Sequence, residues 1–223
     1  TPEHQARWLA PLLAGEIRSC FAMTEPKVAS SDATNIESSI VRDGDDYVIN
    51  GLKWYTTNAT DPRCKIAIFM GKSDPDNADR HRQQSMILVP MDTPGVSVGK
   101  SDRKMGQAGS HIADIVMDNV QLPADALLGD EEGKGFVTAM QSLDNGRLSV
   151  GSAAAGYARR ALDSALRYAN ERKAFGEPIA NFQLIQQMLA DSEIEIYAAE
   201  AMMKDVTARA DAGENILVKA AAF

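Results

Sequence analysis

The spacing of apolar residues changes once along the chain, and this change limits the possible folds more than any other feature. From Ile17 to about Leu128, apolar residues occur in short or alternating runs separated by turn residues. After Gly133-Lys134-Gly135 they recur at every third or fourth position. A period of two is typical of strands and a period of 3.6 is typical of helices. The sequence therefore predicts an α+β protein in which an all-β unit precedes a helical one.

Seven segments of the first region are predicted to be strands, because they are short, apolar or alternating, and bounded by turn residues. They cover residues 19–23, 36–41, 47–49, 65–70, 85–89, 96–98 and 112–117. Asp43-Gly44-Asp45-Asp46 and Asn50-Gly51 are tight-turn signals. These short strands predict an antiparallel β-barrel or sandwich.

The rest of the chain is predicted to be helical. Thr1-Pro2 forms an N-cap and a first helical position, and this helix ends near Gly15. A long helix follows over residues 136–173, and Asn181 is the expected N-cap of another that runs to Ala210. A third begins after Gly213-Glu214-Asn215.

The expected domains are the end of an N-terminal helical domain (1–16), a β-domain (17–130) and the start of a C-terminal four-helix bundle (131–223). Because the sequence begins on a helix cap and stops within a helix, we expect it to be a fragment of a longer protein.

Charge and cysteine content exclude several classes of function. The 223 residues include 23 Lys and Arg against 31 Asp and Glu, a net charge of -8, which disfavours nucleic acid as a partner. Cys20 and Cys64 are distant and lack a CxxC motif, so neither a disulfide framework nor a metal site is expected. No apolar run is long enough for a membrane span, and no signal peptide is visible. We expect a cytoplasmic protein, or one of the mitochondrial matrix if the source is eukaryotic.

Three blocks are rich in residues with special chemistry. They are Met23-Thr24-Glu25-Pro26 with Ser31-Asp32, Asn50-Gly51-x-Lys53 with Thr57-Asn58, and Arg172-x-x-Phe175-Gly176-x-Pro178 with Gln183. In their order and spacing these blocks resemble the acyl-CoA dehydrogenase family over essentially the whole chain. The resemblance implies FAD as cofactor, an acyl-CoA substrate, an electron-transfer flavoprotein as electron acceptor, and a homo-oligomer, either a dimer or a tetramer.

The resemblance also implies which residues of the β-unit bind the flavin. Phe21, Met23 and Thr24 would line it, and the Thr24 hydroxyl is able to hydrogen-bond the polar edge of the ring. Tyr55 and Thr57, two apart on a predicted strand, share one side, where the ring packs on the flavin and the hydroxyl approaches its reactive nitrogen. Trp54 is expected on the opposite side, in the core.

In the helical region, the resemblance implies that Arg172 reaches the FAD pyrophosphate of a neighbouring subunit. A guanidinium suits this role because it binds phosphate through two hydrogen bonds. Phe175 and Gln183 would contact the adenosine half. The alternative for Arg172 is a cation that stabilises the helix C-terminus.

Ser31, Ser110 and Arg147 are the residues that the resemblance implies for CoA binding. Ile112 departs from the Thr found in many members, which weakens the assignment of the Ser110 loop. As an alternative, Arg147 is an ordinary surface or paired arginine.

Dehydrogenation of a thioester requires a carboxylate to remove the α-proton while the β-hydrogen leaves as hydride. A minority of the family carries the glutamate directly before the arginine that matches Arg147, but Gly146 stands there. Asp144 is a weak candidate because it points about 200° away around the helix. The base is therefore expected beyond Phe223, and the fragment itself is expected to be inactive.

Two other readings stay open. An acyl-CoA oxidase or a flavin monooxygenase could use the same scaffold, and a non-catalytic CoA-binding or scaffold protein could keep the fold without the flavin.

Overall fold

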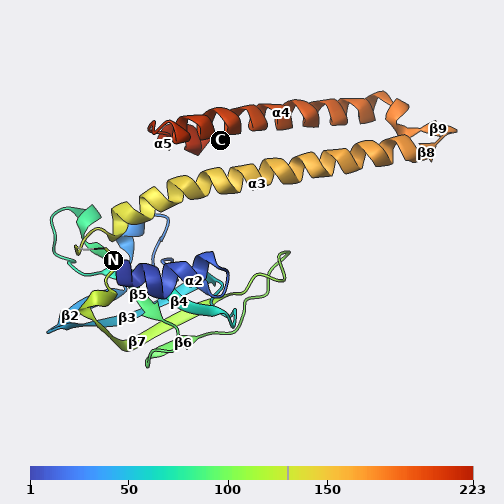
Figure 1. The fold of residues 1–223 in the computed structure, drawn as a ribbon. Coiled ribbons are helices and arrows are strands. Elements are labelled where there is room, and N and C mark those ends of the chain that lie inside the picture. Colours follow the sequence, from blue (N-terminus) through green and yellow to red (C-terminus); the bar gives the residue numbers. More distant parts are fainter. Residues whose placement is uncertain (130, 223) are drawn as a thin grey trace. The chain divides into compact units, whose positions relative to one another are not determined.

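The computed structural model describes residues 1–129 and 131–222, and the chain divides into two compact units, Thr1–Ala139 and Met140–Phe223 (Figure 1). The first unit contains a mixed β-sheet and the second a pair of long helices, so the expected α+β fold class is confirmed. Within the described residues, no helix combines the length and hydropathy that crossing a membrane requires.

The first unit begins with a short helical segment and continues with seven strands. The helical segment consists of α1 (Pro2–His4), a π-helical turn (Gln5–Leu9) and α2 (Ala10–Leu13). The Thr1 hydroxyl accepts a hydrogen bond from the His4 amide at 3.2 Å, which confirms the predicted cap. The strands are β1 (Arg18–Ala22), β2 (Ser39–Asp43), β3 (Asp46–Thr57), β4 (Cys64–Lys72), β5 (Gln84–Pro90), β6 (Val96–Val98) and β7 (Ile112–Pro123). Each of the seven predicted segments overlaps a strand, but the tight turn predicted at Asn50-Gly51 is wrong, because β3 continues through both residues.

The strand order is β1-β4-β2-β3-β7-β6, with β5 on the other side of β4. The β2–β3, β3–β7, β4–β5 and β6–β7 pairs are antiparallel, as expected. However, β1 lies parallel to β4, and β2 touches β4 in the same sense through Ser39 and Lys72. Parallel pairing joins segments that are distant in sequence, which a pattern of local turns does not reveal.

Alternation along the strands determines which side chains form the core. In β7, Ala113, Ile115 and Met117 are buried, and the alternation resumes at Val120 after an irregularity at Asn119, whose φ is 49°. The side chains of β5 are buried on both faces, since the N-terminal helical segment lies near it around Trp8 and Leu88. Cys20 and Cys64 are buried free thiols of this unit.

The second unit is a helical hairpin in which α3 (Gly135–Glu171) and α4 (Gln183–Asp211) run side by side (Figure 1). The two-residue strands β8 (Lys173–Ala174) and β9 (Glu177–Pro178) connect them, and α5 (Leu217–Ala222) follows. Arg159 of α3 forms ion pairs with Glu193 at 2.5 Å and Glu200 at 3.1 Å. Asn181 does not cap α4, because its side chain bonds Glu177 and Phe182 takes the cap position.

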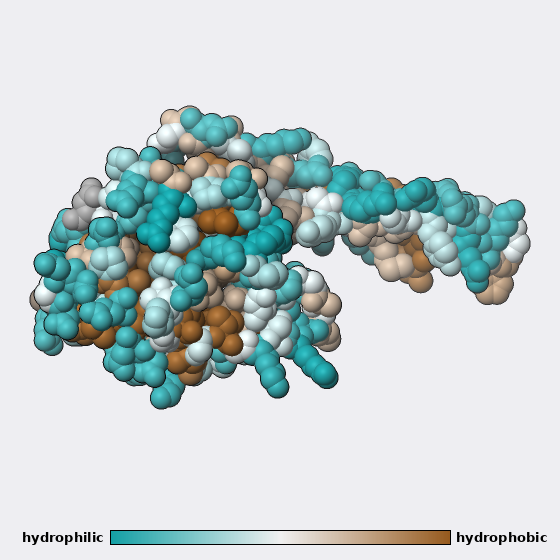
Figure 2. Space-filling view, turned by 60° about the horizontal axis from the view of Figure 1, so that its bottom comes forward, coloured by the Kyte–Doolittle hydropathy of each residue, from teal (hydrophilic) through white to brown (hydrophobic). Residues whose placement is uncertain are grey.

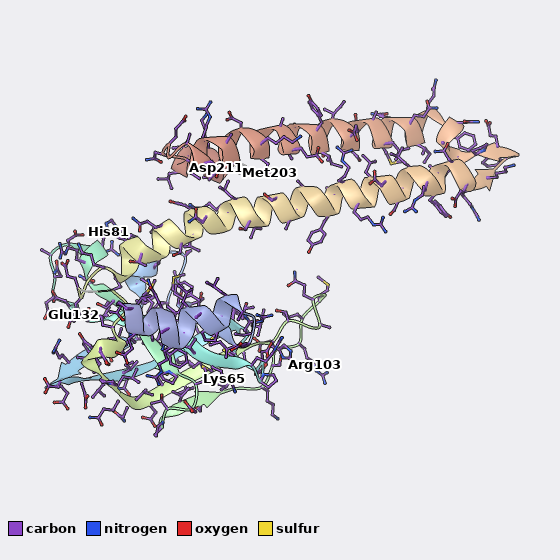
Figure 3. The ribbon with its side chains drawn as sticks, in the orientation of Figure 1. Lys65, His81, Arg103, Glu132, Met203 and Asp211 are labelled. Carbon is purple, nitrogen blue, oxygen red and sulfur yellow. The ribbon has the colours of Figure 1, made fainter. Side chains whose placement is uncertain are left out.

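Side chains that recur along α4 in steps of three and four form a seam that is half-buried or buried at every position, namely Phe182, Ile185, Leu189, Ser192, Ile196, Ala199, Met203, Val206 and Ala210. Met203 belongs to it and lies on the side of α4 that faces α3 (Figure 3). On α3 the buried residues of this unit are Ala155, Leu162 and Ala169, whereas the apolar residues Val150 and Tyr157 are exposed. Figure 2 accordingly shows apolar side chains along part of the helix pair.

Candidate functional site

The end of β1 and the second half of β3 lie together in the first unit. Three hydrogen bonds join them: Asn58 Nδ2 donates to the Ser19 carbonyl, Lys53 Nζ to the Met23 carbonyl, and the Trp54 amide to the Thr24 carbonyl, each at 3.0 Å. Two of the three sequence blocks are thereby brought into contact.

A β-bulge shapes this part of β3. Lys53 is paired with Ile115 and Thr56 with Ala113, so β3 carries one residue more than β7 over this stretch. Tyr55 has a φ of 53°, which is rare for a bulky residue. Its ring is 59% exposed and lies 4.4 Å from the Trp54 ring, measured between centroids. The expectation that Trp54 lies on the opposite side is therefore wrong, because the bulge interrupts the period of two.

The remaining flavin candidates of this unit lie on β1, directly after β1 and at the end of β3. Phe21 is exposed although its neighbours Cys20 and Ala22 are buried, and Met23 and Thr24 are half-buried. Thr57 is exposed at the end of β3, where it pairs with Ile112.

The CoA candidates of the first unit occupy loops. Ser110 is half-buried and lies two residues before Ile112, so its loop borders the strand end that carries Thr57. This loop also carries Arg103 and extends from the sheet (Figure 3). Ser31 is exposed, whereas the neighbouring Ser30 hydroxyl accepts from the Glu25 amide at 2.8 Å and stabilises the turn.

Beneath the bulge lies a buried ion pair. Lys53 Nζ is 2.7 Å from Glu25 Oε1, and the two residues are 0% and 4% exposed. Burial alone raises the pKa of Glu25, but the Lys53 ammonium and hydrogen bonds from Ser38 and Glu37 hold it below the usual value. Burial lowers the pKa of Lys53 to about 8, although Glu25 opposes this shift. Both groups are charged at neutral pH.

The candidates of the second unit gather at the connection between α3 and α4. Arg172 is exposed, and its carbonyl accepts from the Ile179 amide at 2.8 Å. Phe175 has a φ of 54°, is 99% exposed and meets Phe182 edge to face at 6.2 Å. Gln183 begins α4 and is exposed.

Arg147 lies elsewhere in the second unit, on α3, and forms an ion pair with Asp144. The Asp144 carboxylate is therefore engaged by a side chain of its own helix.

The side chains around the β3 bulge fit a planar aromatic cofactor. Tyr55 presents an exposed ring, Thr57 presents an exposed hydroxyl, and the buried Trp54 Nε1 and Thr56 Oγ1 atoms have no hydrogen-bond partner within the described residues. Unsatisfied buried polar groups are uncommon, and a bound ligand or water is one explanation for them. A flavin ring combines a large apolar face with polar edge atoms, which matches this set.

Glu25 and Lys53 lie within the first two sequence blocks, but neither was predicted to have a role. The available signal was a lysine at a position where β3 alternates toward the core. Such a charge is almost never fully buried without a partner.

Comparisons with known proteins agree with both units. Residues 20–120 match the family description "Acyl-CoA dehydrogenase, middle domain", and residues 133–223 match "Acyl-CoA dehydrogenase, C-terminal domain". The chain is 51% identical over 203 residues to "Probable acyl-CoA dehydrogenase FadE2" of Mycobacterium tuberculosis. That alignment covers 91% of this chain and 49% of the relative, so the chain spans about half the relative's length.

Solved structures share the fold. An acyl-CoA dehydrogenase from Geobacillus kaustophilus superposes with a TM-score of 0.93 at 34% identity, covering 99% of this chain and 57% of that protein. A glutaryl-CoA dehydrogenase from Mycobacterium smegmatis, in complex with FADH2, superposes with a TM-score of 0.89 at 29% identity, covering 99% and 54%.

Proposed function

The chain belongs to the acyl-CoA dehydrogenase family, and on this premise we propose that it forms the flavin-binding part of an enzyme that introduces an α,β double bond into an acyl-CoA thioester. The observation that carries the proposal is the exposed Tyr55 ring and Thr57 hydroxyl beside the Met23-Thr24 segment. The cofactor proposed for this surface is FAD.

Each residue around the bulge has a proposed role in holding the cofactor. Phe21 and Tyr55 supply aromatic contact, Thr24 and Thr57 offer hydroxyl groups to its polar edge, and Met23 lines the ring. Arg172 binds the pyrophosphate of FAD in a neighbouring subunit, where Phe175 and Gln183 contact the adenosine half. The functional protein is then a homo-oligomer.

The reaction requires separate acceptors for a proton and a hydride. When bound, FAD supplies the hydride acceptor. The proton goes to a carboxylate, and Asp144 is a poor choice because it is paired with Arg147. We assign the role to a glutamate of the longer protein outside these residues, so that the 223 residues alone are inactive.

Substrate and partner assignments follow from the same premise. Ser31, Ser110 and Arg147 are the proposed CoA contacts, an electron-transfer flavoprotein is the proposed electron acceptor, and the cytoplasm or mitochondrial matrix is the proposed location.

The test begins with the visible absorption spectrum of the purified full-length protein and of the cofactor released from it by denaturation. The spectrum of FAD, bleached anaerobically by an acyl-CoA, is the expected result. A protein without flavin would contradict the proposal and support a CoA-binding scaffold. Rapid reoxidation of the reduced flavin in air would instead indicate an oxidase or monooxygenase.

A further inference from the structure

The Glu25–Lys53 ion pair lies in the interior of the first unit, and each of its charged atoms makes hydrogen bonds. Glu25 accepts hydrogen bonds from Lys53 Nζ at 2.7 Å, from the Glu37 amide at 2.7 Å and from the Ser38 amide at 3.0 Å. Lys53 Nζ also lies 4.9 Å from the centre of the Phe69 ring. Such a pair is no ordinary stabilising device, because burying two charges costs about as much as their attraction returns.

The hydrogen bonds of Lys53 suggest why the protein contains a buried ion pair despite the cost of desolvating two charges. Its ammonium donates a second hydrogen bond to the Met23 carbonyl at 3.0 Å, and the next residue, Trp54, bonds the Thr24 carbonyl with its amide. Lys53 also directly precedes the bulge that exposes Tyr55. One side chain thus connects the Met23-Thr24 segment to the strand that presents Tyr55.

Glu25 fixes the same segment from its other end. It directly follows Thr24, and its carboxylate is anchored to the backbone of Glu37 and Ser38, just before β2. The Glu25 amide and carbonyl both bond the Ser30 hydroxyl, at 2.8 and 3.1 Å. The backbone of residues 23–25 is therefore held at three successive residues, two of which carry proposed flavin contacts.

We propose that the Glu25–Lys53 pair positions the two flavin-contacting segments, holding Met23-Thr24 and the Trp54-Tyr55 bulge in the arrangement that binds the cofactor. Glu25 and Lys53 touch no substrate and are positioning residues. This inference rests on the proposed function, since it concerns how that same site binds its flavin.

The experiment compares two variants of the full-length protein. Lys53→Met removes the charge at similar length and leaves Glu25 buried without a counter-charge, so it is expected to destabilise the fold strongly. The double variant Glu25→Gln/Lys53→Met removes both charges, so it leaves no unpaired buried charge and is expected to be clearly more stable than Lys53→Met. Neither variant supplies a donor to the Met23 carbonyl.

The readouts are the dissociation constant for FAD and the visible spectrum of the bound flavin, with folding followed by circular dichroism. The folded double variant should bind FAD at least about tenfold more weakly, the equivalent of one lost hydrogen bond, and show a shifted flavin spectrum. If the pair serves only stability, the double variant regains wild-type affinity and spectrum together with its stability, and the inference is overturned.

The matched control removes another ion pair of the same unit. Arg82 and Glu131 lie 2.5 Å apart on the surface, and Glu131→Gln/Arg82→Met should leave FAD affinity and spectrum unchanged. A wild-type protein that binds no flavin would refute the proposed function itself, whereas a flavin-binding wild type with an indistinguishable double variant refutes only the positioning role.

Discussion

At the scale of single residues, the conformation of Tyr55 is the most informative feature. An ordinary strand would turn this side chain and that of Trp54 to opposite faces, but the left-handed backbone at Tyr55 brings the rings to 4.4 Å and leaves Tyr55 exposed. Non-glycine residues in such conformations cost free energy and concentrate at functional sites. The bulge therefore presents an aromatic surface that regular pairing with β7 would not provide.

Thr57 tests whether the hydroxyl beside the bulge acts on the flavin. Thr57→Ala in the full-length enzyme is expected to slow flavin reduction by an amount equivalent to about 1–3 kcal/mol, the value of one well-placed hydrogen bond. Thr207→Ala, at an exposed position of α4, is the control. Stopped-flow absorbance under anaerobic conditions measures the rate of flavin reduction in both variants. An unchanged rate for Thr57→Ala would refute the placement of its hydroxyl beside the flavin.

The buried carboxylate of Glu25 is expected to make the stability of the protein depend on pH. Its pKa is lowered in the folded protein, so the stability it contributes is fully present above its ordinary pKa of about 4.3 and is lost as the pH falls through the folded value. Glu25→Gln should therefore lower the free energy of unfolding by about 3–5 kcal/mol at neutral pH, and by less in acid. Denaturant titrations at pH 7 and below pH 4 measure the difference in the free energy of unfolding between the wild type and Glu25→Gln. If this difference does not depend on pH, Glu25 is not the group responsible.

At the scale of elements, the helical hairpin depends on one apolar seam. The α4 positions that face α3 alternate in steps of three and four, which keeps a single stripe on one side of the helix. The Arg159 ion pairs flank this stripe and fix the register of the two helices.

Two isoleucines on α4 test the seam. Ile196 is 7% exposed and Ile194 is 67% exposed. Ile196→Ala should lower the free energy of unfolding of this unit by about 2–4 kcal/mol, because it leaves a cavity, whereas Ile194→Ala should change it by less than about 0.5 kcal/mol. Thermal or urea unfolding provides the comparison, and equal effects would mean that the seam lies on another face.

Local patterns predicted these elements well and their three-dimensional partners less well. Short apolar or alternating runs predicted seven segments that overlap the seven strands, and the steps of three and four predicted the buried face of α4. The turn predicted at Asn50-Gly51 was wrong, because β3 continues through it. The parallel pairing of β1 with β4 was not predictable, because it depends on contacts between distant segments. The bulge at Tyr55 was missed for a related reason: a period of two assumes an uninterrupted register, and the extra residue is visible only when β7 is in place.

At the scale of the whole molecule, the α3–α4 connection carries the exposed residues for which we propose a contact with a neighbouring subunit. Phe175 is almost completely exposed in a left-handed conformation next to Arg172, an arrangement with little benefit to an isolated hairpin. This is consistent with the proposed contact to the cofactor of a neighbouring subunit.

Arg172 tests this proposal, since it would link cofactor retention to assembly. Arg172→Ala in the full-length protein is expected to be depleted of FAD after purification, because the phosphates lose a bidentate partner. Arg167→Ala, which replaces an exposed arginine near the end of α3, should retain FAD. Flavin-to-protein absorbance ratios and light scattering measure content and oligomeric state. If Arg172→Ala keeps all its FAD at dilutions at which the wild type also keeps it, Arg172 is only a helix-terminal charge.

The parallel pairing of β1 with β4 has a consequence for the order in which the protein folds. Cys20 of β1 contacts Ile66 of β4 across 46 residues of sequence, whereas β2 and β3 are joined by a tight turn at Gly44. Closing a long loop is slower than closing a hairpin. β1 must wait for β4, and the bulge of β3 must wait for β7, because Thr57 pairs with Ile112 still farther along the chain, so both flavin-contacting segments depend on pairings between distant parts of the sequence. We therefore expect FAD supplied during refolding to be taken up only in the slowest kinetic phase.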